Sequence, residues 1–397
     1  MKKTTLFLIL MLSATIIFGQ SKNEYLKKVL NKLEKVKSAT YNIRGEGWAP
    51  ADTAASIIMN HFVKEYNHPQ DSTIGASFVS LLQKDTTQMT FSYDGKMSAD
   101  VYYENKTIVI DSFMVKRAPF RVLTPPFFSR TKNIFRYALE TKDSILIKIE
   151  EQKESVYCRF TIFGNKQVEF FGKAYYIENP YDFGDATSKY EIWIDKSTDL
   201  PYKVRREMST DISVETISNV SLNKIKIEDF KASNYFQPDY KLVAYGEGNK
   251  KQKENSLIGK KAPNWALVDT NNKPLSLNAL KSKVVMIQFT SVSCGPCRVS
   301  IPFLNKLTSA YNKKDFDFAA IECTANSLRA LQFYQNKNAI NYKFLKSTKA
   351  VLKDYEVTSY PVFFILDKNR VIKKIINGYG QTTTDKEIRD TIDKLLK

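Results

Sequence analysis

Two of the four cysteines in this chain of 397 residues lie three positions apart, in the stretch TSVSCGPCRVSIP. Thiols at this spacing can bind a metal, close a small structural disulfide, or exchange disulfides with other molecules. A zinc site needs four ligands, and the only histidines, His61 and His68, are far away in the sequence. A disulfide between Cys294 and Cys297 would close too short a loop to stabilise the fold by much. The spacing therefore favours redox chemistry, with no metal and no other cofactor expected.

The elements around the pair are expected to place the two thiols differently. The apolar run KVVMIQFT predicts a buried strand, and a helix is expected from Gly295 to about Tyr311. Cys294 then lies at a helix N-terminus, whose unpaired N–H groups stabilise a thiolate. Pro296 suits the first turn, because its missing N–H would have no helical partner there. We therefore expect Cys294 to be the nucleophile, and Cys297 to be the thiol that resolves a mixed disulfide.

The C-terminal part of the chain resembles a known family. The stretches LIGKKAPNWALVDTNNKPLSLNALKSKVVMIQFTSVSCGPCRVSIPFLNKL and EVTSYPVFFILDKNRVI are similar to the thioredoxin fold, specifically to the TlpA/ResA group of exported thiol-disulfide oxidoreductases. The resemblance covers residues 257–397. It implies that the Tyr360–Pro361 peptide is cis and faces the cysteines, and that Tyr360, Pro361, Gly295 and Pro296 contact a protein disulfide substrate. It also implies a membrane thiol that donates electrons.

The chain departs from this family next to the cysteines. Ser293 replaces a usual Trp, while Gln288 and Ser300 replace carboxylates that accept a proton from the second cysteine. Glu322, at the end of the next predicted strand, is a candidate substitute for that proton acceptor. The alternative is that Glu322 is an exposed carboxylate at a strand end. The Gly-Pro pair between the cysteines resembles reducing thioredoxins, so the resemblance implies a reductase.

Two alternative functions are also compatible with the sequence. A peroxidase related to the peroxiredoxins would share the fold, but its Thr stands three residues before the reactive cysteine, whereas Thr290 stands four before Cys294. The second alternative is an exported protein whose main function is to bind a lipid, a lipoprotein or a partner. In that case the redox pair would be secondary or inert. Of the other two cysteines, Cys158 is expected to be a buried free thiol and Cys323 a partly buried one. The alternatives are that Cys323 is a third redox thiol and, as a minor alternative, that the two form a disulfide.

The first residues have the pattern of an export signal, with two lysines followed by an apolar run and then small or polar residues. Residues 1–20 are therefore predicted to be a cleaved signal peptide, with no cysteine to carry a lipid, and the protein is predicted to be periplasmic. The net charge is +18. Its lysines are scattered and are not interleaved with aromatic residues, so nucleic acid is not an expected partner.

The polar segment YGEGNKKQKENSLIGKKAP predicts a boundary between two domains. Residues 21–245 are expected to form a β-rich α+β domain, an antiparallel sheet with helices. Residues 246–256 form the predicted linker. The predicted thioredoxin-like α/β domain then occupies residues 257–397, where strands alternate with helices and a hairpin follows.

Within the first domain, helices are expected at residues 23–37 and 129–137. The stretch YEIWIDKSTDLPYKVRREM predicts a hairpin whose turn runs from Asp195 to Pro201. The sequence of this hairpin resembles that of LolA-like domains, which carry lipids or lipoproteins in a half-barrel under a helical lid. The resemblance implies a concave pocket lined by apolar and aromatic side chains. The alternative is that these side chains fill a core.

Overall fold

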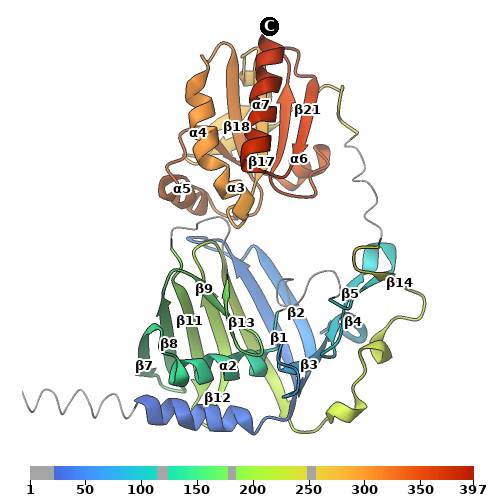
Figure 1. Ribbon diagram of the computed structural model, residues 1–397, viewed down its shortest axis with the longest axis vertical. Coiled ribbons are helices and arrows are strands. Elements are labelled where there is room, and N and C mark those ends of the chain that lie inside the picture. Colours follow the sequence, from blue (N-terminus) through green and yellow to red (C-terminus); the bar gives the residue numbers. More distant parts are fainter. Residues whose placement is uncertain (1–21, 114–123, 178–184, 248–255) are drawn as a thin grey trace, which may run out of the picture.

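The structure, a computed structural model, describes residues 22–113, 124–177, 185–247 and 256–397. These residues form two bodies, each built on its own sheet, which lie end to end along the long axis of the molecule (Figure 1). The predicted signal peptide and most of the predicted linker lie outside the described residues. Within the four described ranges, no helix is long and apolar enough to cross a lipid bilayer.

The N-terminal body contains a twelve-stranded sheet in the order β14-β6-β5-β4-β3-β2-β1-β13-β12-β11-β8-β7. Neighbouring strands run antiparallel, except that β14 runs parallel to β6. The strands β9 and β10 form a separate antiparallel ribbon. The strands are β1 (Ser38–Trp48), β2 (Ile57–Asn67), β3 (Ala76–Leu82), β4 (Asp85–Tyr93), β5 (Ser98–Tyr102), β6 (Thr107–Asp111), β7 (Ser144–Glu151), β8 (Ser155–Phe163), β9 (Gln167–Phe170), β10 (Ala174–Ile177), β11 (Ser188–Asp195), β12 (Leu200–Glu207), β13 (Ile212–Leu222) and β14 (Lys241–Ala244).

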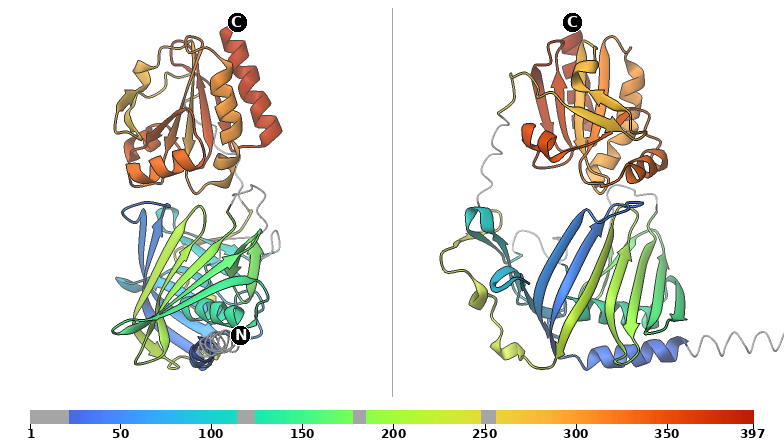
Figure 2. Two further views of the ribbon diagram at one scale, coloured as in Figure 1. Left: turned by 90° about the vertical axis from the view of Figure 1, so that its left-hand side faces the viewer. Right: turned by 180° about the vertical axis from the view of Figure 1, so that it is seen from behind.

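A helix over residues 22–34 and the helix α2 (Phe127–Glu140) pack against one face of this sheet (Figure 2). The start of α2 is held by the sheet, because the Glu65 carboxylate of β2 accepts hydrogen bonds from the amides of Phe128 at 3.1 Å and Ser129 at 2.6 Å. Amides in the first turn of a helix have no partner within the helix, so this carboxylate supplies the cap. Short 3₁₀ turns, η1 (Tyr103–Asn105), η2 (Ile227–Asp229) and η3 (Ala232–Tyr235), complete this body.

The predicted helices and the predicted hairpin of this body are present. The first helix ends at residue 34 rather than 37, because the amides of Lys35 and Val36 bond to carbonyls three residues back and tighten the last turn. The hairpin is confirmed, since β11 ends at Asp195 and β12 begins at Leu200. The strands β1 to β5 were not individually expected from the sequence.

The C-terminal body is a seven-stranded mixed sheet in the order β16-β15-β19-β18-β17-β20-β21. The strands β17, β18 and β19 are parallel, whereas β20 runs antiparallel to β17. The elements are β15 (Ala266–Asp269), β16 (Pro274–Ser276), η4 (Leu277–Ala279), β17 (Val284–Thr290), α3 (Gly295–Val299), α4 (Ile301–Ala310), β18 (Phe316–Glu322), α5 (Leu328–Lys337), β19 (Lys343–Lys346), α6 (Lys349–Asp354), β20 (Val362–Leu366), β21 (Ile372–Asn377) and α7 (Gln381–Leu396).

Every residue of β17 and β20 is buried, because apolar clusters cover both faces of the sheet. Side chains from α4, α5 and α7 contribute to one cluster, and residues around α6 and β15 contribute to the other. This explains the continuous apolar run at β17, since a strand buried on both faces has no polar side to alternate with. The predicted alternation of strands and helices is confirmed.

One predicted helix of this body is divided. Instead of a single helix from Gly295 to about Tyr311, the chain forms α3 and α4, which meet at Ser300. Pro302 lies in the first turn of α4 and has no N–H to donate to the carbonyl of Arg298. The interruption leaves the cysteines on a short helix of their own.

Candidate active site

Three strands bring the predicted site residues to one edge of the C-terminal sheet. Because β17 and β18 are parallel, their carboxyl ends coincide, and Thr290 pairs with Glu322. The strand β20 runs the other way, so its first residue, Val362, lies opposite Phe289 near the end of β17. The Tyr360–Pro361 peptide immediately before β20 therefore lies at the edge from which the cysteine segment departs.

Cys294 and Cys297 are joined by a disulfide at this edge. Cys294 is the N-cap residue of α3, and Pro296 lies in the first turn, as predicted. The Cys297 amide donates to Cys294 Sγ over 3.1 Å. An N–H group aimed at a sulfur stabilises negative charge on that sulfur. Once the disulfide is reduced, this contact would favour the thiolate form of Cys294.

The two sulfur-bearing residues differ in exposure. Cys297 is 2% exposed, whereas Cys294 and the adjoining Gly295 are half-buried and Ser293 is exposed. An external disulfide can therefore approach Cys294, while Cys297 lies behind it. This asymmetry suits an attacking thiol and a resolving thiol.

Below the pair lies an uncharged hydrogen-bond network. Gln288 and Ser300, which occupy positions where the family has carboxylates, are both buried, at 1% and 0% exposed. The Ser300 hydroxyl donates to the Cys297 carbonyl at 2.6 Å and accepts from Gln288 Nε2 at 3.2 Å. These two residues fix the backbone under Cys297 but supply no base.

The Glu322 side chain is buried, at 1% exposed, so the alternative that it is an exposed carboxylate is wrong. Its oxygens accept hydrogen bonds from the amides of Val292 at 3.2 Å, Thr324 at 2.9 Å and Ala325 at 2.8 Å, and from the Thr324 hydroxyl at 2.7 Å. Burial raises the pKa of Glu322, and these hydrogen bonds act in the opposite direction. The carboxylate therefore ties the turn before Cys294 to the loop after β18.

The Tyr360–Pro361 peptide bond is cis, as the resemblance implied. Its position is held by the Pro361 carbonyl, which accepts from the Gly378 amide at 2.8 Å. Tyr360 and Cys323 pack against the same apolar cluster, and burial raises the pKa of both side chains. The cis peptide thus lies beside the end of β18, close in the fold to the cysteine segment.

Cys158 and Cys323 are free thiols, so the minor alternative of a disulfide between them is wrong. Cys158 of β8 is 0% exposed, and burial raises its pKa to about 12. Cys323 is half-buried and its thiol donates to the Ile321 carbonyl at 3.2 Å. With their thiolate forms disfavoured, neither has the properties of a reactive cysteine.

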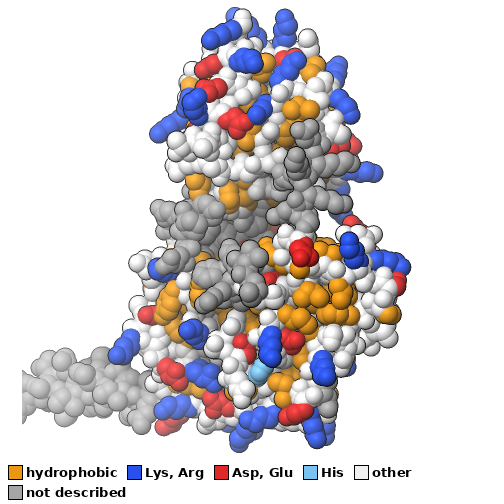
Figure 3. Space-filling view, turned by 45° about the vertical axis from the view of Figure 1, so that its right-hand side comes forward, with side chains coloured by type: hydrophobic (Ala, Val, Ile, Leu, Met, Phe, Trp, Pro, Cys, Tyr) orange, Lys and Arg blue, Asp and Glu red, His pale blue; other side chains and the backbone are white. Residues whose placement is uncertain are grey.

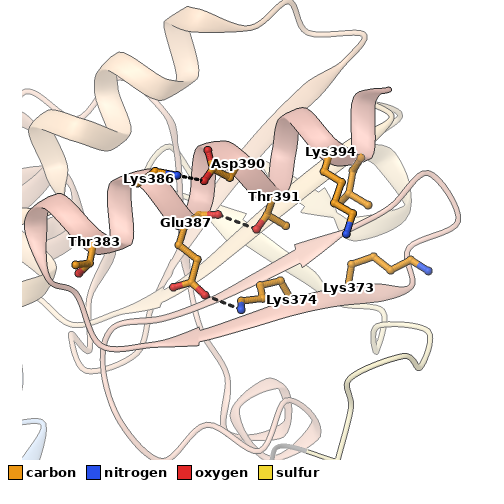
Figure 4. A pocket seen from close by; sticks show the side chains of 9 residues that line it. Lys373, Lys374, Thr383, Lys386, Glu387, Asp390, Thr391 and Lys394 are labelled. Carbon is orange, nitrogen blue, oxygen red and sulfur yellow. Dashed lines mark hydrogen bonds and ion pairs between the residues drawn. The ribbon is translucent and has the colours of Figure 1, made fainter.

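A groove of about 800 Å³ lies between α7 and β21, and none of the predicted site residues lines it (Figure 4). Its lysines are partly neutralised, since Lys374 pairs with Glu387 at 2.6 Å and Lys386 pairs with Asp390 at 2.5 Å. On the visible face of the molecule, Lys and Arg side chains are spread over the surface (Figure 3). This distribution agrees with a solvated basic surface.

Apolar side chains of the helix over residues 22–34, of α2 and of the sheet form one core in the N-terminal body. The helix α2 is thus a core helix of this body rather than a lid of the kind that the LolA-like resemblance would imply, with Phe127 and Phe135 fully buried. A pocket of about 460 Å³ remains near the ends of β1 and β2. Its lining includes the apolar Ile57, Met59, Phe170 and Val214. It also includes six charged residues, which are Arg130, Arg206, Glu46, Glu169, Asp211 and Glu215.

Residues 257–392 match the Redoxin family. Among curated proteins, the thiol-disulfide oxidoreductase ResA of Bacillus cereus is 29% identical over 125 residues, which cover 31% of this chain and 72% of that protein. The thioredoxin-like protein YneN of Bacillus subtilis is 31% identical over 139 residues, which cover 34% of this chain and 78% of that protein. A solved thiol:disulfide interchange protein of the thioredoxin family from Chlorobium tepidum is 22% identical, with a TM-score of 0.32, and the match covers 34% of this chain and 96% of that one.

Proposed function

Through its C-terminal domain this chain belongs to the thioredoxin-like, TlpA/ResA-type thiol-disulfide oxidoreductases, and we propose that it reduces disulfide bonds of other proteins in the periplasm. The observation that carries the proposal is the contrast within the pair, where Cys294 is half-buried beside an aimed N–H group and Cys297 is buried behind it. The predicted signal peptide supports export. A membrane dithiol is the proposed source of electrons.

The reaction begins from the reduced pair. The Cys294 thiolate attacks one sulfur of the substrate disulfide, that S–S bond breaks, and the departing substrate thiolate takes up a proton. The Cys297 thiol then loses its proton and attacks Cys294 Sγ, which releases the second substrate sulfur as a thiolate. Two electrons have passed to the substrate, and the Cys294–Cys297 disulfide remains, as in this structure. The donor dithiol reduces it again by the same two exchanges in reverse.

Four other residues are proposed to hold the substrate against Cys294. Tyr360 and Pro361 lie at the same sheet edge, and backbone before a cis-proline can pair with an extended substrate segment. Gly295 and Pro296 form the surface immediately after the attacking sulfur. A substrate would lie between these two segments.

Glu322 remains our candidate for the group that accepts the Cys297 proton. Among the described residues of the C-terminal domain it is the buried carboxylate, and its pKa is raised by that burial. A carboxyl group with a raised pKa is closer to the pKa of a thiol and exchanges protons with it more readily near neutral pH. The neighbouring Gln288 and Ser300 cannot take this role.

Reduction of insulin by dithiothreitol, followed as turbidity, tests the proposal. The wild-type protein is expected to accelerate the reaction, and Cys294→Ser is expected to abolish the acceleration. Cys323→Ser is the matched control, because this thiol lies at the same sheet edge and is expected to be dispensable. Full activity of Cys294→Ser would refute the assigned role.

A second candidate function is the binding of a lipid or lipoprotein by the N-terminal domain. The pocket of about 460 Å³ with an apolar wall favours it, since small-molecule sites are concave and mainly apolar with a few polar groups. Mass spectrometry of lipid extracted from the purified protein tests this function. Replacing Met59 by Glu should remove the bound lipid, and an extract with no lipid would refute this candidate.

A further inference from the structure

The turn that joins β1 to β2, residues 49–56, reaches the C-terminal domain, and we call it the hairpin tip. Within it, the Asp52 carboxylate accepts hydrogen bonds from the amides of Asn326 at 3.0 Å and Ser327 at 2.8 Å, and from the Ser327 hydroxyl at 2.6 Å. The Asn326 side chain donates to the Ala55 carbonyl at 2.7 Å. Because Ser327 is the N-cap residue of α5, the hairpin tip is bonded to the start of that helix.

Apolar contact accompanies these hydrogen bonds. Ala49 is 7% exposed and belongs to the core cluster of the C-terminal domain, together with Val292, Ile301 and Ala330. Within the tip, Pro50 lines a narrow gap shared with residues of both domains. A residue of one domain that is buried in the core of the other indicates a specific contact.

A second contact lies at the other end of α5. Lys337, the last residue of this helix, donates to the Ser209 carbonyl at 3.4 Å. Ser209 and Thr210 belong to the turn between β12 and β13, and they line the same gap as Phe333. Helix α5 therefore contacts the N-terminal domain near both of its ends.

These contacts reach the residues that flank the redox pair. Val292 and Arg298, on either side of the CGPC segment, line the gap opposite Pro50. The view in Figure 1 agrees, since α3 lies on the side of the C-terminal domain that faces the N-terminal sheet. The Glu322 carboxylate binds the amides of both Val292 and Ala325, and Ala325 precedes the segment that Asp52 holds.

We propose that the docked N-terminal domain restricts which disulfides reach Cys294, and that Asp52 is the residue that keeps it docked. This inference rests on the proposed function of the same site. The N-terminal domain occupies the side of the redox pair formed by Val292 and Arg298, so a compact protein cannot approach from there. Ser293 is exposed and Cys294 is half-buried, so a small or extended disulfide still has access. The partner class is therefore an extended polypeptide segment that carries an accessible disulfide.

The test compares two oxidants on the full-length protein after its redox pair has been reduced. One is the small aromatic disulfide 5,5′-dithiobis(2-nitrobenzoate), and the other is insulin, whose disulfides lie in a compact protein. If the docked form makes up about 90% of molecules, undocking of the N-terminal domain raises the fraction of molecules whose Cys294 is open to a compact protein about tenfold. This factor is the largest increase expected in the rate of reaction with insulin. The rate with the small disulfide should not change.

Asp52→Ala removes the three hydrogen bonds that the Asp52 carboxylate accepts, whereas Asp52→Asn keeps one acceptor oxygen and is expected to give an intermediate gain. Asp94→Ala is the matched control, because the Asp94 carboxylate caps another hairpin turn through the amides of Lys96 and Met97. Hydrogen exchange of the Asn326 and Ser327 amides reports the contact itself. Both amides should exchange faster in Asp52→Ala than in the wild type or in Asp94→Ala.

Faster amide exchange together with a raised insulin-to-small-disulfide rate ratio supports the proposal. Faster exchange with an unchanged ratio overturns it, and so does unchanged exchange in Asp52→Ala. If Asp52→Ala does not fold, the same comparison is made with Asp52→Asn. A wild-type protein that reacts with neither oxidant refutes the proposed function and this inference together, which distinguishes that failure from the other two.

Discussion

Replacing Glu322 by Ala removes the acceptor of four hydrogen bonds at the edge of the sheet where the redox pair lies. Two of the donors, the amides of Val292 and Ala325, belong to residues that are 3% and 6% exposed. Each buried donor left without an acceptor costs about 1–3 kcal/mol. Release of a buried carboxylate offsets part of this loss, so the free energy of unfolding should fall by about 2–4 kcal/mol.

Denaturant unfolding of the oxidised full-length protein measures this change. Trp265 is 2% exposed in the C-terminal domain, so its fluorescence should report the transition that shifts. Glu322→Gln is the conservative control, because its amide keeps one acceptor oxygen and places an NH₂ group against a remaining donor. The free energy of unfolding of Glu322→Gln should be about 1–2 kcal/mol lower than that of the wild type.

The stability difference between the wild type and Glu322→Gln should also depend on pH. Burial raises the folded-state pKa of Glu322 above its ordinary value of 4.5, so the folded state binds this proton more tightly than the unfolded state does. Its contribution to stability is therefore greatest below pH 4.5 and declines as the pH rises through the folded-state pKa. Glu322→Gln has no such titrating group. The difference in free energy of unfolding between the wild type and this variant should therefore shrink as the pH rises through the folded-state pKa of Glu322. A loss below about 0.5 kcal/mol in Glu322→Ala, or a pH-independent difference, would refute the reasoning.

Three further predictions concern single residues. Cys297→Ser should accumulate a mixed disulfide with insulin through Cys294, which gel electrophoresis without reductant would detect, and its absence would contradict the assigned order of attack. In the reduced native protein at pH 8, iodoacetamide should label Cys294 but not Cys158, whose pKa burial raises to about 12, and mass spectrometry should find Cys158 labelled only after unfolding. Arg206→Ala should leave the Glu169 carboxylate without its cation in a largely buried site, where the Tyr190 hydroxyl still donates to it, and should cost up to about 3–5 kcal/mol in denaturant unfolding. A cost under about 1 kcal/mol would show that the pair contributes little.

The sequence was most informative where the determining contacts are local. The strand β17, the cap at Cys294 and the proline at position 296 follow one another within a few residues, and each constrains the backbone by itself. The cis peptide before Pro361 was predicted from the family resemblance together with the chemistry of proline. These local features are sufficient to locate the redox pair and to place the cis peptide at the same edge of the sheet.

Features that depend on distant segments were not predicted. The strand β1 has glycines at positions 45 and 47, and glycine is depleted in strands, so its pattern was weak. The burial of Glu322 is not evident from its own strand, because the amides that surround its carboxylate come from two separate loops. The contact between Asp52 and Asn326 joins residues 274 positions apart, and no pattern within either segment signals it.

The midpoint potential of the Cys294–Cys297 pair in the mature protein tests the proposed reductase most directly. Equilibration with defined thiol buffers, followed by alkylation of the free thiols, would measure it. A reductase supplied with electrons by a membrane dithiol predicts a value near that of thioredoxin, about −270 mV. A value near about −120 mV, typical of a protein that donates disulfides, would contradict the account, and so would a pair that does not cycle at all.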